Sequence, residues 1–286
     1  MRSRSESPDG RIKNTSLHDS YHLVVIRVSR RIESMKRWEA AIATENPRIL
    51  YRAVQLLNEL GIDYIICSPA DSRCNYSHVI IADSEAGFEG HEGRVLVQDG
   101  FDMDFVRIAV MAKLKAIQNP ARAVIGIDPG MTSGIALVID GVAVYQNSLV
   151  TPKDVTEQSH RLTAYIEMLF PQCPIIVRVG TGSKLYSALL LRAILCKGEN
   201  LTIELVNEKN TTVSSGARSD ESSAILIAGR NGRPMTSADM MLEAKVGYIR
   251  SLKQFVSRLT REKRVLTSDE ARAILLDDMT LDDILT

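Results

Sequence analysis

Two runs of β-branched residues separated by Asp-Pro-Gly most constrain how this chain of 286 residues can fold. The stretch AVIGIDPGMTSGIALV, residues 123–138, predicts two buried strands joined by a turn. Asp128 falls where the first strand ends, and a buried carboxylate without a partner is costly. Its carboxylate therefore either accepts hydrogen bonds from turn amides or holds a bound group, most simply a cation.

The residues that follow predict a specific order of elements. Asp140-Gly141 is typical of a hairpin that leads into a third strand. Beyond that strand the pattern alternates between helix and strand, so we expect an α/β fold in which a three-stranded meander precedes helix, strand, helix, strand and helix. The expected helices cover residues 156–170, 184–198 (ended by Gly198) and 220–229, and the expected strands cover residues 174–180 and 201–207.

A smaller α/β unit is predicted before the meander. Asn46-Pro47 is a typical helix start and Gly61 a typical helix end. Short apolar strands are expected over residues 62–68, 78–83 and 94–99, followed by a helix over residues 103–118 that ends before Pro120. Residues 1–34 are polar and basic, and we expect a disordered or mobile extension in which only Tyr21–Val28 has strand character.

The last part of the chain is predicted to be helical. One long amphipathic helix is expected over residues 237–259, and Thr267 and Glu270 have capping-box spacing at the start of a shorter helix. The sequence therefore predicts an extension over residues 1–34, a small α/β domain over 35–120, a second α/β domain over 121–234 and a helical extension over 235–286.

The composition is that of a globular protein without a membrane span, with 45% hydrophobic and 24% charged residues. No window approaches the run of about 20 apolar residues that a transmembrane helix needs, and the first residues lack the apolar core of a signal peptide. The four cysteines form no CxxC pair, and a chain of this length does not need disulfides. We expect a cytoplasmic protein with reduced cysteines and no membrane partner.

The formal net charge is zero, but the charges are unevenly distributed. Residues 245–264 carry seven Lys and Arg against Glu262 alone, and the residues after them are mainly acidic. A basic helix is often a solvated face, but one without acidic partners also suits nucleic-acid binding. Arg250, Lys253 and Arg261 are the candidate contacts.

Three segments resemble the RNase H-like superfamily. IGIDPG, which contains Asp128, resembles the first-strand signature of the RuvC resolvases. LVNEKNTTV, residues 205–213, and SDESSAILIAG, residues 219–229, resemble the fifth strand and the closing helix of the YqgF branch. The resemblance covers residues 121–229, where the second domain is then expected to be an RNase H-like mixed sheet with flanking helices.

The resemblance implies a metal-dependent endonuclease that hydrolyses phosphodiester bonds in structured or branched DNA or RNA, as Holliday junction resolvases do. Two Mg²⁺ or Mn²⁺ ions would be held by Asp128, Glu208 and Asp220. Further candidate contacts to the nucleic acid are Thr132, Lys184, Thr211 and Thr212. Resolvases of this type usually act as dimers, which makes a homodimer the expected assembly.

The sequence also departs from the pattern. Arg178 and Gly180 lie where RuvC enzymes have a glutamate, and Asn207 replaces an aspartate of the fifth strand. These departures leave open a non-catalytic nucleic-acid-binding protein whose RNase H-like site has decayed. A third alternative is an ATP-binding module of the actin and sugar-kinase type, because Asp-x-Gly-x-Thr (residues 128–132) also occurs in its phosphate loop. That architecture needs a second such domain, and no meander is predicted before Ala121.

Each candidate also has a purely structural interpretation. Glu208 suits a surface residue after a strand, and Asp220 suits the first turn of a helix, where acids are favoured. His160 is most simply a helix-surface residue. Cys67, Cys74, His78 and His91 have the right chemistry for zinc, but their spacing fits no common zinc site.

Overall fold

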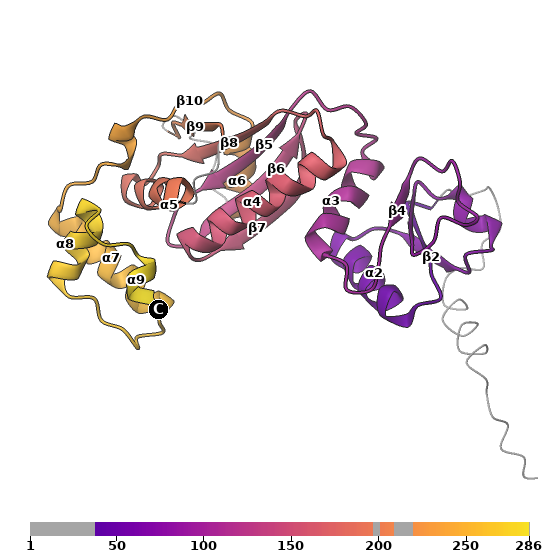
Figure 1. Ribbon diagram of the computed structural model, residues 1–286, viewed down its shortest axis with the longest axis horizontal. Helices are drawn as coiled ribbons and strands as arrows, with labels where there is room; N and C mark the ends of the chain where they lie inside the picture. The colour runs from indigo at the N-terminus through magenta and orange to yellow at the C-terminus, as the bar shows by residue number, and fades with distance from the viewer. Residues whose placement is uncertain (1–37, 197–200, 209–219, 286) are drawn as a thin grey trace, which may run out of the picture.

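The computed structural model describes residues 38–196, 201–208 and 220–285, which form two β-sheets with their helices and a group of C-terminal helices (Figure 1). The fold is α/β, as expected. The predicted extension over residues 1–34, including Tyr21–Val28, lies outside the described residues, and so does Gly198.

The first sheet has four parallel strands in the order β2-β1-β3-β4. Local signals set the boundaries of its first helix, because the side chain of Asn46 accepts from the amide of Arg48 at 2.9 Å and Gly61 ends the helix with a φ of 65°. Its elements are β1 (Ala40–Ala43), α2 (Pro47–Leu60), β2 (Tyr64–Cys67), η1 (Ser72–Tyr76), β3 (Val79–Ala82), β4 (Arg94–Leu96) and α3 (Met103–Leu114).

The expectation that all four cysteines are reduced is wrong for one pair. Cys67 at the end of β2 and Cys74 in η1 form a disulfide, with their Cα atoms 6.3 Å apart. The turn between the two elements folds back and brings the cysteines within the range that a disulfide requires. Both side chains are buried, which the seven-residue spacing in the sequence did not indicate.

The second sheet has six strands in the order β10-β9-β8-β5-β6-β7. The strands β5, β6 and β7 form the expected antiparallel meander, with Asp140 and Gly141 both at positive φ in the hairpin turn. The strands β8 and β9 continue the sheet in parallel to β5, and this mixed sheet is consistent with the RNase H-like fold. The strands are β5 (Ala123–Asp128), β6 (Ser133–Ile139), β7 (Val142–Leu149), β8 (Ile175–Gly180), β9 (Ile203–Val206) and β10 (Arg233–Pro234).

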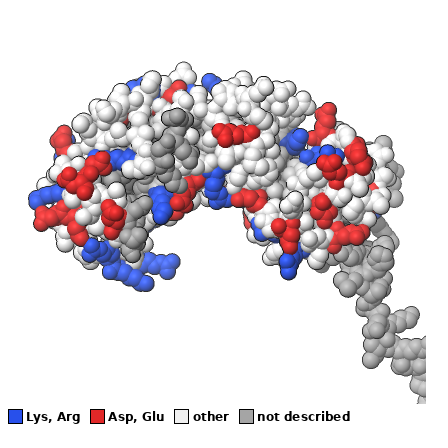
Figure 2. Space-filling model, in the orientation of Figure 1, with Lys and Arg blue, Asp and Glu red and all other residues white. Residues whose placement is uncertain are grey.

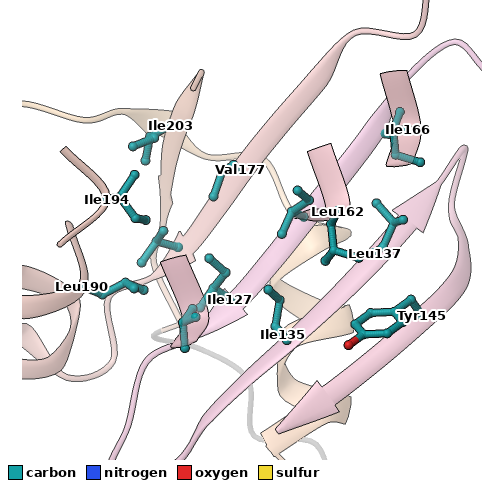
Figure 3. Close-up of a cluster of buried hydrophobic side chains, with 14 of the residues drawn as sticks. Ile127, Ile135, Leu137, Tyr145, Leu162, Ile166, Val177, Leu190, Ile194 and Ile203 are labelled. Atoms are coloured by element: carbon teal, nitrogen blue, oxygen red, sulfur yellow. The ribbon is translucent and has the colours of Figure 1, made fainter. Parts of the chain in front are cut away.

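Helices cover both faces of the second sheet. On one face, α4 (Pro152–Leu169) and α5 (Lys184–Cys196) pack on an aliphatic core (Figure 3). The core residues labelled there are Ile127, Ile135, Leu137, Tyr145, Leu162, Ile166, Val177, Leu190, Ile194 and Ile203. On the other face, α6 (Asp220–Ala228) packs directly on β5 and β6.

Two of these helices differ from prediction in detail. Helix α4 begins four residues earlier than expected, since Thr151 caps it through a bond from the amide of Asp154 at 3.0 Å and Pro152 suits the first turn. Its His160 is half-buried rather than a simple surface residue. Helix α3 ends at Leu114 instead of residue 118, because Ala116 takes a positive φ that a continuing helix does not allow.

The C-terminal residues form several short helices. The predicted single helix over residues 237–259 is divided into a 3-10 turn, η2 (Ser237–Met240), and α7 (Val246–Leu259). Arg192 of α5 explains the break, because it donates two hydrogen bonds to the carbonyl of Met240 at 2.8 and 3.0 Å and so holds the turn against α5. The chain then forms α8 (Ser268–Leu276), with the predicted capping box, and α9 (Asp282–Leu285).

Helix α3 packs on both sheets. Val106 and Val110 lie in the core of the first sheet, whereas Ile108 lies in the core of the second. No helix among the described residues has the length and apolar character needed to cross a membrane.

Candidate active site

Asp128 lies at the carboxyl end of β5, the central strand of the second sheet, on the face that α6 covers. Its neighbours Ile125 and Ile127 point into the core on the opposite face, and in a strand alternate residues share a face. Within the described residues, no amide of the following turn donates to its carboxylate, and the amide of Gly130 instead donates to Ser133 Oγ at 3.4 Å. The turn therefore does not explain why an aspartate ends this strand.

Glu208 reaches the same sheet edge from beyond β9. Its Oε1 accepts a hydrogen bond from the amide of Gly182 at 2.8 Å. A Cβ atom at Gly180 would overlap with this carboxylate, and one at Gly182 would come within 2.8 Å of Oε2. Gly180 follows Val179, which is paired with Ile127. The two glycines thus leave room for the Glu208 carboxylate over the loop that faces the end of β5.

Asp220 enters the site as the first residue of α6. Gly134 pairs with Asp128 across β5 and β6, and a Cβ atom at Gly134 would overlap with the backbone carbonyl of Asp220. The N-terminus of α6 therefore lies against the pair that contains Asp128. Glu221, the next residue, accepts a hydrogen bond from Ser148 Oγ of β7 at 3.1 Å.

The electrostatics show that the other two acidic residues act on Asp128. Burial raises the pKa of Asp128 to about 6, the negative charges of Glu208 and Asp220 act in the same direction, and a hydrogen bond from the Ser223 hydroxyl acts against them. The neighbouring negative charges thus add to the effect of burial. All three predicted acidic residues are thus brought to one edge of the sheet.

In the described part of the chain, the three acidic side chains are not arranged around a single point where one cation could bind. Within the described part of the chain, no three His, Cys, Asp or Glu side chains are arranged as a metal centre. The bond from the Gly182 amide holds the Glu208 carboxylate toward the loop. Three carboxylates from three different elements are nevertheless the donors that Mg²⁺ and Mn²⁺ prefer, so the donor chemistry fits these ions.

Arg178 does not occupy the acidic site, although the sequence placed it where an acid would lie. Its side chain is 4% exposed, donates to Glu204 Oε2 at 2.8 Å and donates to the carbonyl of Ala228 at 2.8 Å. A cation at the last carbonyls of a helix is favourable. Arg178 thus ties the C-terminus of α6 to β8 and β9.

The other predicted contacts are distributed over three regions. Thr132 is half-buried in the turn between β5 and β6, and Lys184 is exposed at the start of α5. Lys184 and Asn207 line a groove of about 660 Å³ that begins beside Gly182. Arg250, Lys253 and Arg261 belong to α7 and the turn after it, and Thr211 and Thr212 lie outside the described residues.

Three contributors to the site were missed in the sequence. They are the Gly182 amide that donates to Glu208, the Ser223 hydroxyl near Asp128, and the two glycines, Gly134 and Gly180, that leave space for Asp220 and Glu208. The small residues after Asp220 were a signal for Ser223, which lies one turn into α6. No zinc centre forms from the cysteine and histidine candidates, because Cys67 is bonded to Cys74.

Comparisons with known proteins add little to this geometry. No family model and no curated protein matches the chain. One solved structure with some similarity is the Argonaute of Marinitoga piezophila in complex with a 5′ OH guide RNA, at 13% sequence identity and a TM-score of 0.25. The alignment covers 62% of this chain and 40% of the Argonaute chain. A similarity at this TM-score supports no conclusion about the fold or function of this chain.

The fold and the site themselves define a class. The chain is an α/β protein in which a small parallel sheet is followed by a mixed six-stranded sheet with helices on both faces and by C-terminal helices. At the carboxyl edge of the mixed sheet, Asp128 lies near enough to Glu208 and Asp220 for their charges to act on its carboxylate.

Proposed function

We propose that the protein is a metal-dependent nuclease that hydrolyses phosphodiester bonds in structured or branched nucleic acid. The observation that carries the proposal is the approach of Asp128, Glu208 and Asp220 to one edge of a sheet in which a meander precedes parallel strands. The resemblance of these segments to the RuvC and YqgF proteins supports the same chemistry.

Each acidic residue has a distinct place in the proposed site. Asp128 is central, since the charges of both other acids act on it, and with Glu208 and Asp220 it would hold Mg²⁺ or Mn²⁺. Glu208 would turn from the Gly182 amide, and Asp220 would approach from the helix. Two bound divalent cations supply a nucleophile from water and stabilise the leaving oxygen. The Ser223 hydroxyl, whose hydrogen bond lowers the pKa of Asp128, would help to orient that carboxylate.

Lys184 supports nucleic acid as the substrate. It is exposed at the rim of the groove beside Gly182, and within the described residues no carboxylate pairs with it. A lysine there would contact a phosphate next to the one held by the acidic residues. Asn207 lines the same groove rather than the acidic face, so its replacement of an aspartate removes no carboxylate from the side of Asp128.

Cleavage assays test the proposal. Hairpin, four-way junction and single-stranded DNA and RNA are incubated with the protein and Mg²⁺ or Mn²⁺. We expect metal-dependent cleavage that falls by several orders of magnitude in Asp128→Asn, because a metal site without its central carboxylate loses both functions of the ions. Glu167→Gln, which neutralises an exposed acid on α4, is the matched control and should cleave as the wild type does.

A binding protein with a decayed site is the second candidate. It is favoured by the absence of a ready-made metal centre among the described residues. Binding of the same substrates without cleavage in either metal would support this candidate and contradict the nuclease. Activity that persists in Asp128→Asn would remove Asp128 from the mechanism.

A further inference from the structure

The C-terminal helices lie next to the carboxyl edge of the second sheet, where Asp128 ends β5; we call this the acidic edge. The ring of Phe255 in α7 contacts the ring of Tyr186 in α5 edge-on, with centroids 5.4 Å apart. Leu185 belongs to the same apolar cluster, and Met131, in the turn that follows Asp128, packs against it. The first turn of α5 and the turn after β5 thus form the surface on which α7 rests.

Helix α7 carries cations on the side that faces away from this cluster. Lys253, Arg258 and Arg261 line a shallow groove of about 650 Å³ together with Gln254, Ser257 and Glu262. We call this the basic groove. The side chains of Arg258 and Arg261 are exposed, and Lys and Arg gather on the lower end of the C-terminal helices in Figure 2.

The cations of the basic groove have no acidic partners. Elsewhere in this segment Lys245 pairs with Glu243 at 3.3 Å and Arg264 pairs with Glu270 at 2.5 Å. In the described portion of the chain, no carboxylate lies within ion-pair distance of Lys253, Arg258 or Arg261. Glu262 is the one acid in the groove lining, so the groove keeps a net positive charge.

The turn after α7 folds back on the helix and keeps its cations close together. Arg261 and Glu262 both take positive φ, 50° and 65°, and their amides bond back to the carbonyls of Arg258 and Ser257 at 3.2 and 2.7 Å. This turn brings Arg261 back beside the last turn of the helix. Arg258 is close enough to α5 for its charge to act on the Tyr186 hydroxyl, whose pKa is raised overall by burial.

We propose that the basic groove binds the phosphate backbone of the nucleic acid that the acidic site cleaves. The choice of nucleic acid as the polyanion rests on the proposed function. Arginine binds phosphate through two parallel hydrogen bonds, and a groove with three unpaired cations suits consecutive phosphates. Helix α7 rests on the turn after Asp128 through its apolar face, so a strand bound in the groove would pass around the helix to reach the acidic residues.

Salt dependence of binding tests this inference. A fluorescein-labelled 24-base-pair DNA duplex and a four-way junction are titrated in EDTA, where no cleavage occurs, at several salt concentrations. The variant carries Lys253→Gln, Arg258→Gln and Arg261→Gln. If each cation contacts one phosphate, the slope of log K against log salt should fall by about 2–3 in magnitude.

Two further variants make the result specific. Arg48→Gln, Lys113→Gln and Lys115→Gln change the net charge equally at exposed residues in α2, in α3 and directly after α3. This triple variant should keep the wild-type slope. Glu262→Gln removes the one acid of the basic groove and should strengthen binding. Unchanged melting temperatures show that each variant is folded.

The outcomes separate this inference from the proposed function. Equal slopes for the wild type and the basic-groove variant would contradict binding of nucleic acid in the groove, even if the protein cleaves DNA with Mg²⁺. A reduced slope without cleavage by the wild type would support the groove and contradict the nuclease. Failure of the wild type to bind either probe would overturn the groove as well.

Discussion

Asp128 ends a strand whose other residues are buried and apolar, and its carboxylate is held near two further negative charges. Such an arrangement destabilises the metal-free protein, since each ionised neighbour opposes ionisation of the others. An acidic residue that lowers stability and lies near two other acids is typical of a functional site rather than of a folding contact. Cations would offset this repulsion, and that gives a test independent of catalysis.

The pKa of Asp128, about 6 against a usual value near 4, predicts a specific dependence of stability on pH. Between about pH 4 and 6 the folded protein binds the proton more tightly than the unfolded chain, so the free energy of unfolding of the wild type falls as the pH rises through this window. Asp128→Asn removes the charge and should melt higher than the wild type at pH 7.5 in EDTA.

The expected gain in melting temperature is about 2–4 °C, a modest value because the carboxyl is partly exposed. The gain should vanish below pH 4, where the wild-type carboxyl is neutral as well. Mn²⁺ should raise the melting temperature of the wild type but not that of Asp128→Asn. Parallel curves for the two proteins from pH 4 to 7.5 in EDTA would contradict the repulsion.

At the residue scale, the sequence predicts where the candidate acids lie in their elements but not what surrounds them. Asp128 and Asp220 could be predicted because a strand end and a helix start are local signals. The contact between Glu208 and the Gly182 amide could not, because it depends on how β8 and β9 pair over 26 residues of sequence. The role of Arg178 could not be predicted for the same reason, since its partner carbonyl belongs to Ala228, 50 residues away.

At the scale of elements, glycines decide how closely α6 and the loop after β8 approach the sheet. Gly126 in β5 lies under α6, where a Cβ atom would overlap with the carbonyl of Ala224 and come within 2.8 Å of the amide of Ala228. Gly180 in β8 instead faces the flexible ends of Glu208 and Ile227. The same substitution should therefore have different effects at the two positions.

We expect Gly126→Ala to destabilise the protein by about 1–3 kcal/mol, because the methyl group pushes the α6 backbone away from β5. Gly180→Ala should cost less stability, since side-chain ends can move, but it displaces the Glu208 carboxylate. Denaturant unfolding measures the first effect, and the shift in melting temperature caused by Mn²⁺ measures the second. A full Mn²⁺ response in Gly180→Ala would contradict the role given to Glu208.

Element boundaries followed the sequence where the signal was local. Asn46 and Gly61 delimit α2 as expected, and Asp140-Gly141 forms the hairpin turn. The boundary inside residues 237–259 was missed because the apolar periodicity continues through it, while the break depends on Arg192 of another helix. The disulfide also required a tertiary approach that spacing alone does not report.

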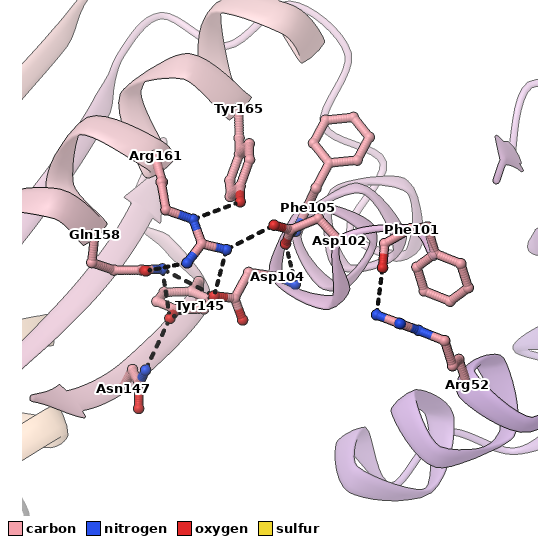
Figure 4. Close-up of polar contacts among 10 residues, drawn as sticks. All are labelled: Arg52, Phe101, Asp102, Asp104, Phe105, Tyr145, Asn147, Gln158, Arg161 and Tyr165. Atoms are coloured by element: carbon pink, nitrogen blue, oxygen red, sulfur yellow. Dashed lines mark hydrogen bonds and ion pairs between the residues drawn. The ribbon is translucent and has the colours of Figure 1, made fainter. Parts of the chain in front are cut away.

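At the scale of the whole molecule, α3 and a polar network connect the two sheets (Figure 4). Arg161 of α4 pairs with Asp102 at 2.7 Å, and the buried Gln158 donates to Asp104 Oδ2 at 3.0 Å and to the hydroxyl of Tyr145 at 2.8 Å. Removal of α3 would leave Gln158 and Tyr145 without one of these partners. The sequence predicts that the second domain begins at residue 121, so the boundary next to Asn119-Pro120 falls after this helix.

Two fragments test where the second sheet becomes independent. A fragment over residues 103–286 keeps α3, and a fragment over residues 121–286 lacks it. We expect the shorter fragment to melt about 5–10 °C lower, since buried polar groups without partners cost about 1–3 kcal/mol each. Equal melting temperatures in calorimetry would show that α3 belongs to the first sheet alone and would support the boundary at Asn119-Pro120.

The double role of α3 also affects the order in which the protein can mature during synthesis. Once α3 has left the ribosome, the side that carries Val106 and Val110 can pack on the first sheet, but the side that carries Ile108 has no partner until the second sheet follows. Its partners in β7 and α4 are translated up to about 60 residues later. A nascent chain paused in that interval therefore exposes an apolar surface to chaperones, and translation speed between residues 115 and 166 becomes a determinant of yield.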